Sequence, residues 1–172
     1  MKNYLLTFAL LGAAVFSCMA QTASKSSNQE SKFSIGVDAG LPTGNASNVY
    51  NFAIGGSVKY EALASTDFFV TFSAGYESFL VKSSLTSLGA KSSMGFVPLK
   101  AGLKYYFSEG FFGEAQVGAS ISAESGGGTA FAFAPCIGYS FNGGFEAGIR
   151  YEDWTKSGNL GQVALRLAYR FN

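Results

Sequence analysis

The sequence predicts an all-β protein, an eight-stranded antiparallel up-and-down transmembrane β-barrel. Three observations predict this fold. From Phe33 to the end of the chain, apolar residues alternate with polar or small ones, and a period of two is the period of a β-strand. Only 13% of the 172 residues are charged, against about 25% in soluble proteins, while 48% are hydrophobic. Short and long connections also alternate between the predicted strands, as they do in membrane barrels.

The chain begins with a predicted signal peptide, residues 1–20. Lys2 precedes an apolar run from Tyr4 and small residues near Ala20, which is the order of regions in a secretory leader. The alternatives are an uncleaved membrane anchor and a lipoprotein leader in which Cys18 is lipidated. Residues 21–32 are polar and without periodicity, and we expect them to form a periplasmic tether. Residues 33–172 then form the barrel domain.

Eight segments carry the alternation, and after the leader no segment reaches the roughly 18 uninterrupted apolar residues of a transmembrane helix. A tilted strand of about 9–11 residues is enough to cross the hydrocarbon layer. The predicted strands are Phe33–Leu41, Tyr50–Glu61, Phe68–Phe79, Gly95–Phe107, Phe111–Ser122, Ala130–Phe141, Phe145–Glu152 and Gln162–Phe171. Pro98 and Pro135 fall inside two of them, so we expect a bulge or an unpaired carbonyl at each.

The two faces of the predicted strands differ in charge. One face carries only apolar residues and glycine, as contact with lipid requires. The opposite face carries six acids and six bases, which would balance one another as a structural charge network in a narrow lumen. A soluble barrel with the opposite orientation has the same periodicity and is the alternative. The twelve residues are Asp38, Lys59, Glu61, Glu77, Lys100, Lys104, Glu114, Glu146, Arg150, Glu152, Arg166 and Arg170.

Aromatic residues near the strand ends predict two girdles at the membrane interfaces. One comprises Tyr105, Phe107, Phe111, Tyr139, Phe141, Phe145, Tyr169 and Phe171, and the other comprises Tyr50, Phe52, Phe79, Phe131 and Tyr151. Trp154 is expected to anchor at the outer interface. The short turns at 62–67, 108–110 and 142–144 predict the periplasmic end, and the longer connections at 42–49, 80–94, 123–129 and 153–161 predict the extracellular end.

Five segments occur in an order that is informative about family: Gly40–Gly44, Ile54–Ser57, Ser73–Tyr76, Pro98–Phe107 and Gly113–Gly118. As an ordered set they resemble the small outer-membrane β-barrel family, also called the porin family, which is similar in architecture to the OmpX and OmpA transmembrane barrels. The resemblance implies a location in the outer membrane and recognition of the final strand, Val163–Phe171, by the outer-membrane assembly machinery. The final strand departs from the family pattern in Asn172, which follows the terminal aromatic, and in Arg166, which stands where glycine is usual.

The chain contains no histidine, which is the commonest general base and metal ligand. Some outer-membrane barrels are enzymes, namely proteases, lipid A deacylases and palmitoyl transferases, and their active sites depend on a histidine. We therefore expect no enzymatic activity. A serine activated by Glu77 or Glu152 is the alternative, and a carboxylate paired with a lumenal base is the simpler interpretation. No metal or cofactor is expected, because Cys136 is the only cysteine left once the leader is removed.

These observations favour an integral outer-membrane barrel without enzymatic activity, with a structural or porin-like role. The interior of eight strands is just wide enough for side chains to fill, so we expect no large, permanently open channel. The alternative is a surface-exposed binding or adhesion module that acts through loops 80–94 and 153–161. The net charge of +1 excludes an electrostatic nucleic-acid partner. The expected partners are outer-membrane lipid and the assembly machinery.

Overall fold

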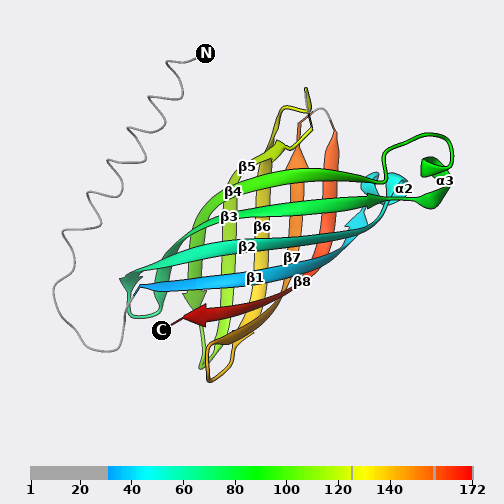
Figure 1. Ribbon diagram of the computed structural model, residues 1–172. Coiled ribbons are helices and arrows are strands. Elements are labelled where there is room, and N and C mark those ends of the chain that lie inside the picture. The colour runs from blue at the N-terminus through cyan, green and yellow to red at the C-terminus, as the bar shows by residue number, and fades with distance from the viewer. Residues whose placement is uncertain (1–30, 125, 157, 172) are drawn as a thin grey trace, which may run out of the picture.

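The computed structural model describes residues 31–124, 126–156 and 158–171. The predicted signal peptide and the predicted tether up to residue 30 lie outside the described residues. The described chain forms one closed barrel in which the strands follow one another in sequence order, each antiparallel to its neighbours (Figure 1). The predicted fold class is therefore confirmed.

The eight predicted strands all form, and most are longer than expected because ladder pairing continues past the hydrophobic alternation. Two single-turn helices lie in the first two long connections, and no helix in the described part of the chain is long and apolar enough to cross a bilayer. The elements are β1 (Lys32–Thr43), α2 (Ala46–Val49), β2 (Tyr50–Ser65), β3 (Phe68–Val81), α3 (Ser83–Thr86), β4 (Ser93–Tyr106), β5 (Phe111–Ser122), β6 (Thr129–Ser140), β7 (Phe145–Thr155) and β8 (Asn159–Phe171).

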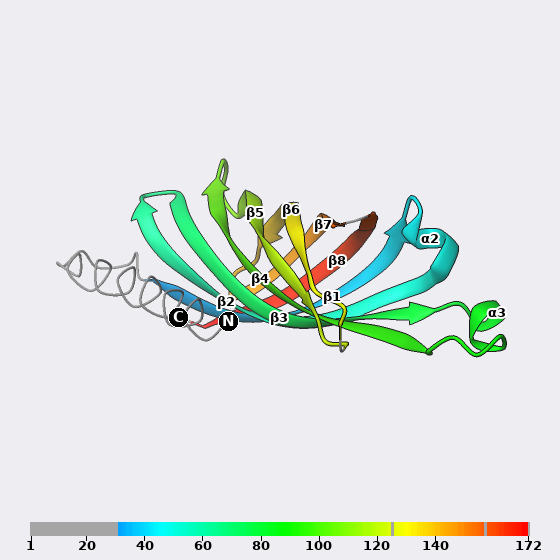
Figure 2. The ribbon, with the colours of Figure 1, turned by 90° about the horizontal axis from the view of Figure 1, so that it is seen from above.

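The two ends of the barrel differ. One end, called the turn end here, carries connections 66–67, 107–110 and 141–144, and Phe33 of β1 pairs there with Phe171 of β8. The other, called the loop end, carries residues 44–49, 82–92, 123–128 and 156–158, of which 125 and 157 are not described. Figure 2 shows that the β3–β4 hairpin, with α3 at its tip, reaches further from the barrel than α2 does.

The pairing between neighbouring strands is interrupted at Pro98 and at Pro135, but the register is the same on both sides of each interruption. The expected bulges are therefore not found at these prolines. Pairing stops over two residues on each strand and resumes in phase, which leaves the facing of every later residue unchanged. The flanking pairs are Ala74–Leu99 and Glu77–Phe96 at Pro98, and Phe133–Asp153 and Cys136–Arg150 at Pro135. The register shifts lie instead between β2 and β3, at Tyr50/Phe52 and Leu63/Ser65.

The outer surface is an exposed apolar belt. Outward residues such as Ile35, Leu99, Ile149 and Leu165 are exposed, whereas the residues that alternate with them are mostly buried. Seven of the eight rings predicted for the girdle at the turn end lie in contact there, in a set from Phe107 to Phe141 and a set from Phe145 to Phe171, with centroids 4.7–6.3 Å apart. A soluble barrel would bury this apolar set, so the structure supports the transmembrane orientation.

The predicted girdle at the loop end is wrong at Tyr50 and Phe79, and the prediction that Trp154 anchors at the outer interface is also wrong. Phe79 and Trp154 are 0% and 2% exposed and lie inside the barrel, where Tyr50 packs against Phe79. Phe79 and Trp154 share the phase of the inward charges Glu77 and Glu152, whereas Tyr50 turns inward beside a register shift. Trp154 is therefore a core residue and not an interfacial anchor.

A charge in the middle of the belt tests the membrane orientation. Ile149 is 59% exposed and lies between the outward side chains of Ile137 and Leu165. In lipid vesicles, Ile149→Arg is expected to lower the free energy of unfolding by about 2–4 kcal/mol, because arginine at mid-bilayer lacks hydration. Urea unfolding followed by fluorescence measures this. Leu88→Arg, at an 83% exposed loop residue, is the control and should leave stability unchanged; equal stability of both variants would contradict the orientation.

Candidate functional site

The most distinctive feature of the barrel is its charged interior. Eleven of the twelve predicted lumenal charges are buried, and Arg170 is partly buried beside Glu146. Small inward residues make room for the long charged side chains. A Cβ atom at Gly36 would lie 2.8 Å from Nη2 of Arg166, for example. Alternation therefore placed these side chains correctly, although it did not indicate which charges pair.

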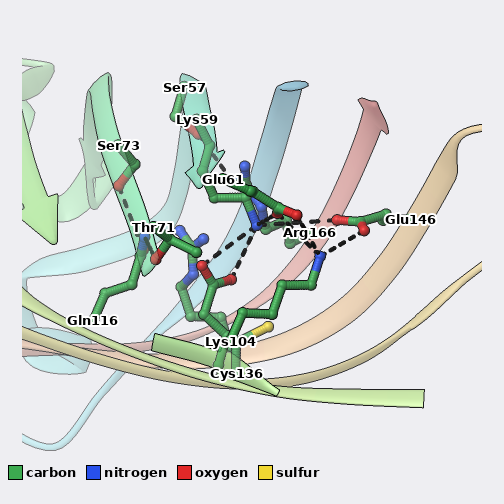
Figure 3. A network of polar contacts seen from close by, with 12 residues as sticks. Ser57, Lys59, Glu61, Thr71, Ser73, Lys104, Gln116, Cys136, Glu146 and Arg166 are labelled. Atoms are coloured by element: carbon green, nitrogen blue, oxygen red, sulfur yellow. Dashed lines mark hydrogen bonds and ion pairs between the residues drawn. The ribbon is translucent and has the colours of Figure 1, made fainter. Parts of the chain in front are cut away.

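Six of the charges form a cluster toward the turn end, with Lys59 and Lys104 at its centre (Figure 3). Lys59 Nζ lies 2.8 Å from Glu61, 3.1 Å from Glu114 and 4.0 Å from Glu146. Lys104 Nζ lies 3.0 Å from Glu61 and 2.6 Å from Glu146. Arg170 Nη1 completes the cluster at 3.0 Å from Glu146. Three bases face three acids, so the formal charge of the turn-end cluster is zero.

Aromatic rings enclose the turn-end cluster. Lys104 Nζ lies 4.1 Å from the centroid of the Phe112 ring and 5.0 Å from that of Tyr106, within range of cation–π attraction. Phe69 packs edge-on against Tyr106 with centroids 5.8 Å apart. The Tyr106 hydroxyl donates to Glu146 and accepts a 2.7 Å hydrogen bond from Arg170. These rings fill the interior between the ion pairs and the turn end.

The other six charges form a second cluster toward the loop end. Asp38 accepts from Arg166 at 2.7 Å and lies 3.2 Å from Arg150. Glu152 lies 3.6 Å from Arg150 and 2.5 Å from Lys100 Nζ. Glu77 accepts a hydrogen bond from the amide of Gln162. With Glu77 included, three acids again face three bases, and the loop-end cluster is also neutral.

Neutral polar side chains fill part of the space between the clusters. Among the described residues, no ion pair joins one cluster to the other. Gln116 donates to Thr71 at 3.2 Å and accepts from Ser73 at 3.4 Å (Figure 3). A cavity bordered by Asp38, Glu77, Lys100 and Arg150 has room for about one water molecule.

An aromatic cluster, missed by the sequence analysis, fills the interior on the loop-end side. The Trp154 ring lies 5.2 Å from Phe79 and 4.9 Å from Phe96, and Tyr50 packs edge-on against Phe79 at 5.4 Å. The indole Nε1 of Trp154 donates a 2.8 Å hydrogen bond to Glu152, and this bond joins the aromatic cluster to the loop-end charge cluster. On its own strand, each of Phe79, Phe96 and Trp154 lies an even number of positions from an inward charged residue. Alternation therefore places all three rings inside the barrel.

The carboxylates considered as general bases are not bonded to serine in the described chain. Glu77 is bonded to Gln162, and Glu152 to Lys100 and Trp154. Ser140 does donate to Glu146 at 2.6 Å, but three cations surround that carboxylate and hold it as an ion-pair partner. Cys136 is buried beside this network as a small apolar side chain. The described residues contain no group of three or more histidine, cysteine or acidic side chains able to hold a metal ion.

Comparisons with known proteins identify the fold. No protein-family model and no curated protein sequence matches the chain. Among solved structures, the attachment invasion locus protein Ail of Yersinia pestis matches with a TM-score of 0.56 at 18% identity, over 83% of this chain and all of Ail. The N-terminal β-barrel domain of Pseudomonas aeruginosa OprF matches with a TM-score of 0.58 at 13% identity, over 84% of this chain and all of that domain.

A third similar structure corrects one expectation. The outer membrane enzyme PagL matches with a TM-score of 0.59 at 14% identity, over 81% of this chain and 99% of PagL. The sequence analysis expected no enzymatic activity, and this match contradicts that expectation because a barrel of the same fold is an enzyme. At these identities the likeness extends to the fold. Together with the exposed belt, it confirms the predicted fold and outer-membrane type: the chain is a small eight-stranded transmembrane β-barrel of the kind found in outer membranes.

Proposed function

We propose that the protein is a structural barrel of the outer membrane whose interior is closed to solutes. The observation that carries this proposal is the filling of the interior along its length: an aromatic cluster, two neutral ion-pair clusters and a second set of aromatic rings follow one another from the loop end to the turn end. Eight strands leave an interior just wide enough for side chains. A porin-like conducting role would need these groups to move apart.

In this proposal the twelve lumenal charges act as a structural network. An isolated charge in a narrow interior loses its hydration, and only a close opposite charge with further hydrogen bonds offsets that cost. Lys104 illustrates the arrangement, since its ammonium contacts two carboxylates and lies over two aromatic rings. The network then maintains a compact cross-section of the barrel, with each cluster holding several strands together.

The proposed partners follow from the outer surface. Outer-membrane lipid would surround the belt, and the assembly machinery would recognise the final strand, Val163–Phe171. That segment lies within β8, where Val163, Leu165, Leu167, Tyr169 and Phe171 all point outward and are exposed. The alternation of these residues with buried ones supports recognition of β8 as an amphipathic strand.

A second candidate function is surface binding through the loops. Similarity of fold to Ail, an attachment invasion locus protein, and the exposure of Leu88 at the tip of the β3–β4 hairpin favour it. The loops also contact each other, because Lys91 pairs with Glu124 and Lys156 donates to the carbonyl of Gly127. Loss of cell binding on deletion of residues 83–92, with the barrel still folded, would favour this candidate over a purely structural role.

Removal of one lumenal cation tests the structural network. Lys104→Met keeps the approximate volume of the side chain but leaves Glu61 and Glu146 without one of their partners. We expect a loss of about 3–5 kcal/mol in the free energy of unfolding, the usual result of removing one member of a buried ion pair. Urea titration of the barrel in vesicles, with Trp154 fluorescence as the signal, measures the change.

The exposed pair Lys91–Glu124 supplies the matched control. Lys91→Met removes the same charge in the same way, and because that side chain is 69% exposed the loss should stay within about 1 kcal/mol. A Lys104→Met barrel as stable as the Lys91→Met barrel would contradict the structural role of the network.

Conductance tests whether the interior is closed. In a planar bilayer, the folded wild-type protein is expected to give no stable open-channel current, because in this proposal the aromatic and charged clusters block the lumen. A triple variant Tyr50→Ala, Phe79→Ala, Trp154→Ala removes three of the four rings of the loop-end aromatic cluster and should still not conduct, since the ion-pair clusters remain. Steady nanosiemens currents from the wild-type protein would overturn the proposal and favour a porin.

A further inference from the structure

The apolar belt contains a groove on the outer face of β2 to β5. In one cross-strand row, Ala101 lies between Phe72 and Val117. In the next row, Ala74 and Ala119 lie on either side of Leu99. The small alanine side chains between larger ones leave an open hollow of about 580 Å³ on the outer surface.

The surface of the groove is apolar. Strand segments that carry Lys59 and Lys100 contribute to its lining, but these side chains point into the barrel and are 1% and 7% exposed. Phe72, Leu99 and Val117 are exposed along its sides. An occupant would therefore meet hydrocarbon and aromatic carbon, with no charge to recognise and no buried polar group to satisfy.

We propose that this groove binds one acyl chain of a membrane phospholipid. The groove is continuous with the belt, so in a transmembrane barrel it opens directly into the hydrocarbon layer. A flexible chain follows an irregular hollow and makes dispersion contacts along its whole length.

The inference goes beyond the closed-barrel function and depends only on the transmembrane belt. The bound lipid would remain on this sector of the barrel when the rest of the bilayer is replaced by detergent. Failure of the lipid site would leave the conductance and the ion-pair network unaffected, so the two proposals can be contradicted separately.

The test compares lipid retention by barrels whose groove is open or filled. The full folded protein is delipidated in detergent, incubated with palmitoyl-oleoyl phosphatidylethanolamine, and examined by native mass spectrometry. Ala101→Phe places a ring in the groove, whereas Ala39→Phe adds the same ring to the exposed outer face of β1, between Ile54 and Leu165. We expect wild type and Ala39→Phe to carry one phospholipid, and Ala101→Phe to bind it on the order of tenfold more weakly.

Three results would overturn the proposal. They are an absence of retained phospholipid on wild type, equal retention by Ala101→Phe, and a wild-type dimer that Ala101→Phe abolishes, which would identify a second copy as the occupant. Folding of each variant is checked by its heat-dependent mobility on a denaturing gel. If Ala101→Phe fails to fold, Ala119→Leu fills the neighbouring part of the groove with a smaller side chain and replaces it.

Discussion

The pairing of charges inside a narrow wall is the constraint on which this structure depends. Because outward positions must be apolar to face lipid, the polar residues of each strand have only the interior to occupy. A charge there has little access to water, so its cost is offset only by a close opposite charge and further hydrogen bonds. Eleven of the twelve charges lie in such pairs, while Glu77 is held by a hydrogen bond from Gln162, and each cluster joins strands from different parts of the sequence.

This constraint also connects the interior to function. Ion pairs at the centre and aromatic rings toward both ends leave space of about one water molecule at the level of Asp38 and Arg150. In the closed-barrel proposal, such an interior binds no solute or substrate. Chemistry and recognition are then expected at the belt and the loops, where the groove between Phe72 and Val117 and the β3–β4 hairpin lie. The outer membrane enzyme PagL has the same fold, so a barrel of this fold can be an enzyme.

Alternation alone predicted all eight strands and the inward facing of all twelve charges, because a period of two is a local property of the chain. The prediction survived Pro98 and Pro135, since the ladder resumes in phase beyond each. It failed where aromatic composition was preferred to phase: Phe79 was assigned to a girdle and Trp154 to the outer interface, although both share the phase of inward carboxylates. Pairs such as Asp38–Arg166 and the groove around Ala101 could not be predicted, because they depend on register between strands.

Reactivity of the Cys136 thiol tests the filled interior most directly. This side chain points inward, lies between Glu114 and Arg150 in the cross-strand row, and is 7% exposed. In a Cys18→Ala chain folded in vesicles, a small charged thiol reagent is predicted to leave Cys136 unmodified until urea unfolds the barrel, while an exposed Ser108→Cys control reacts at once. Modification of Cys136 in the folded barrel at the rate of the control would contradict a closed interior and indicate a water-filled lumen.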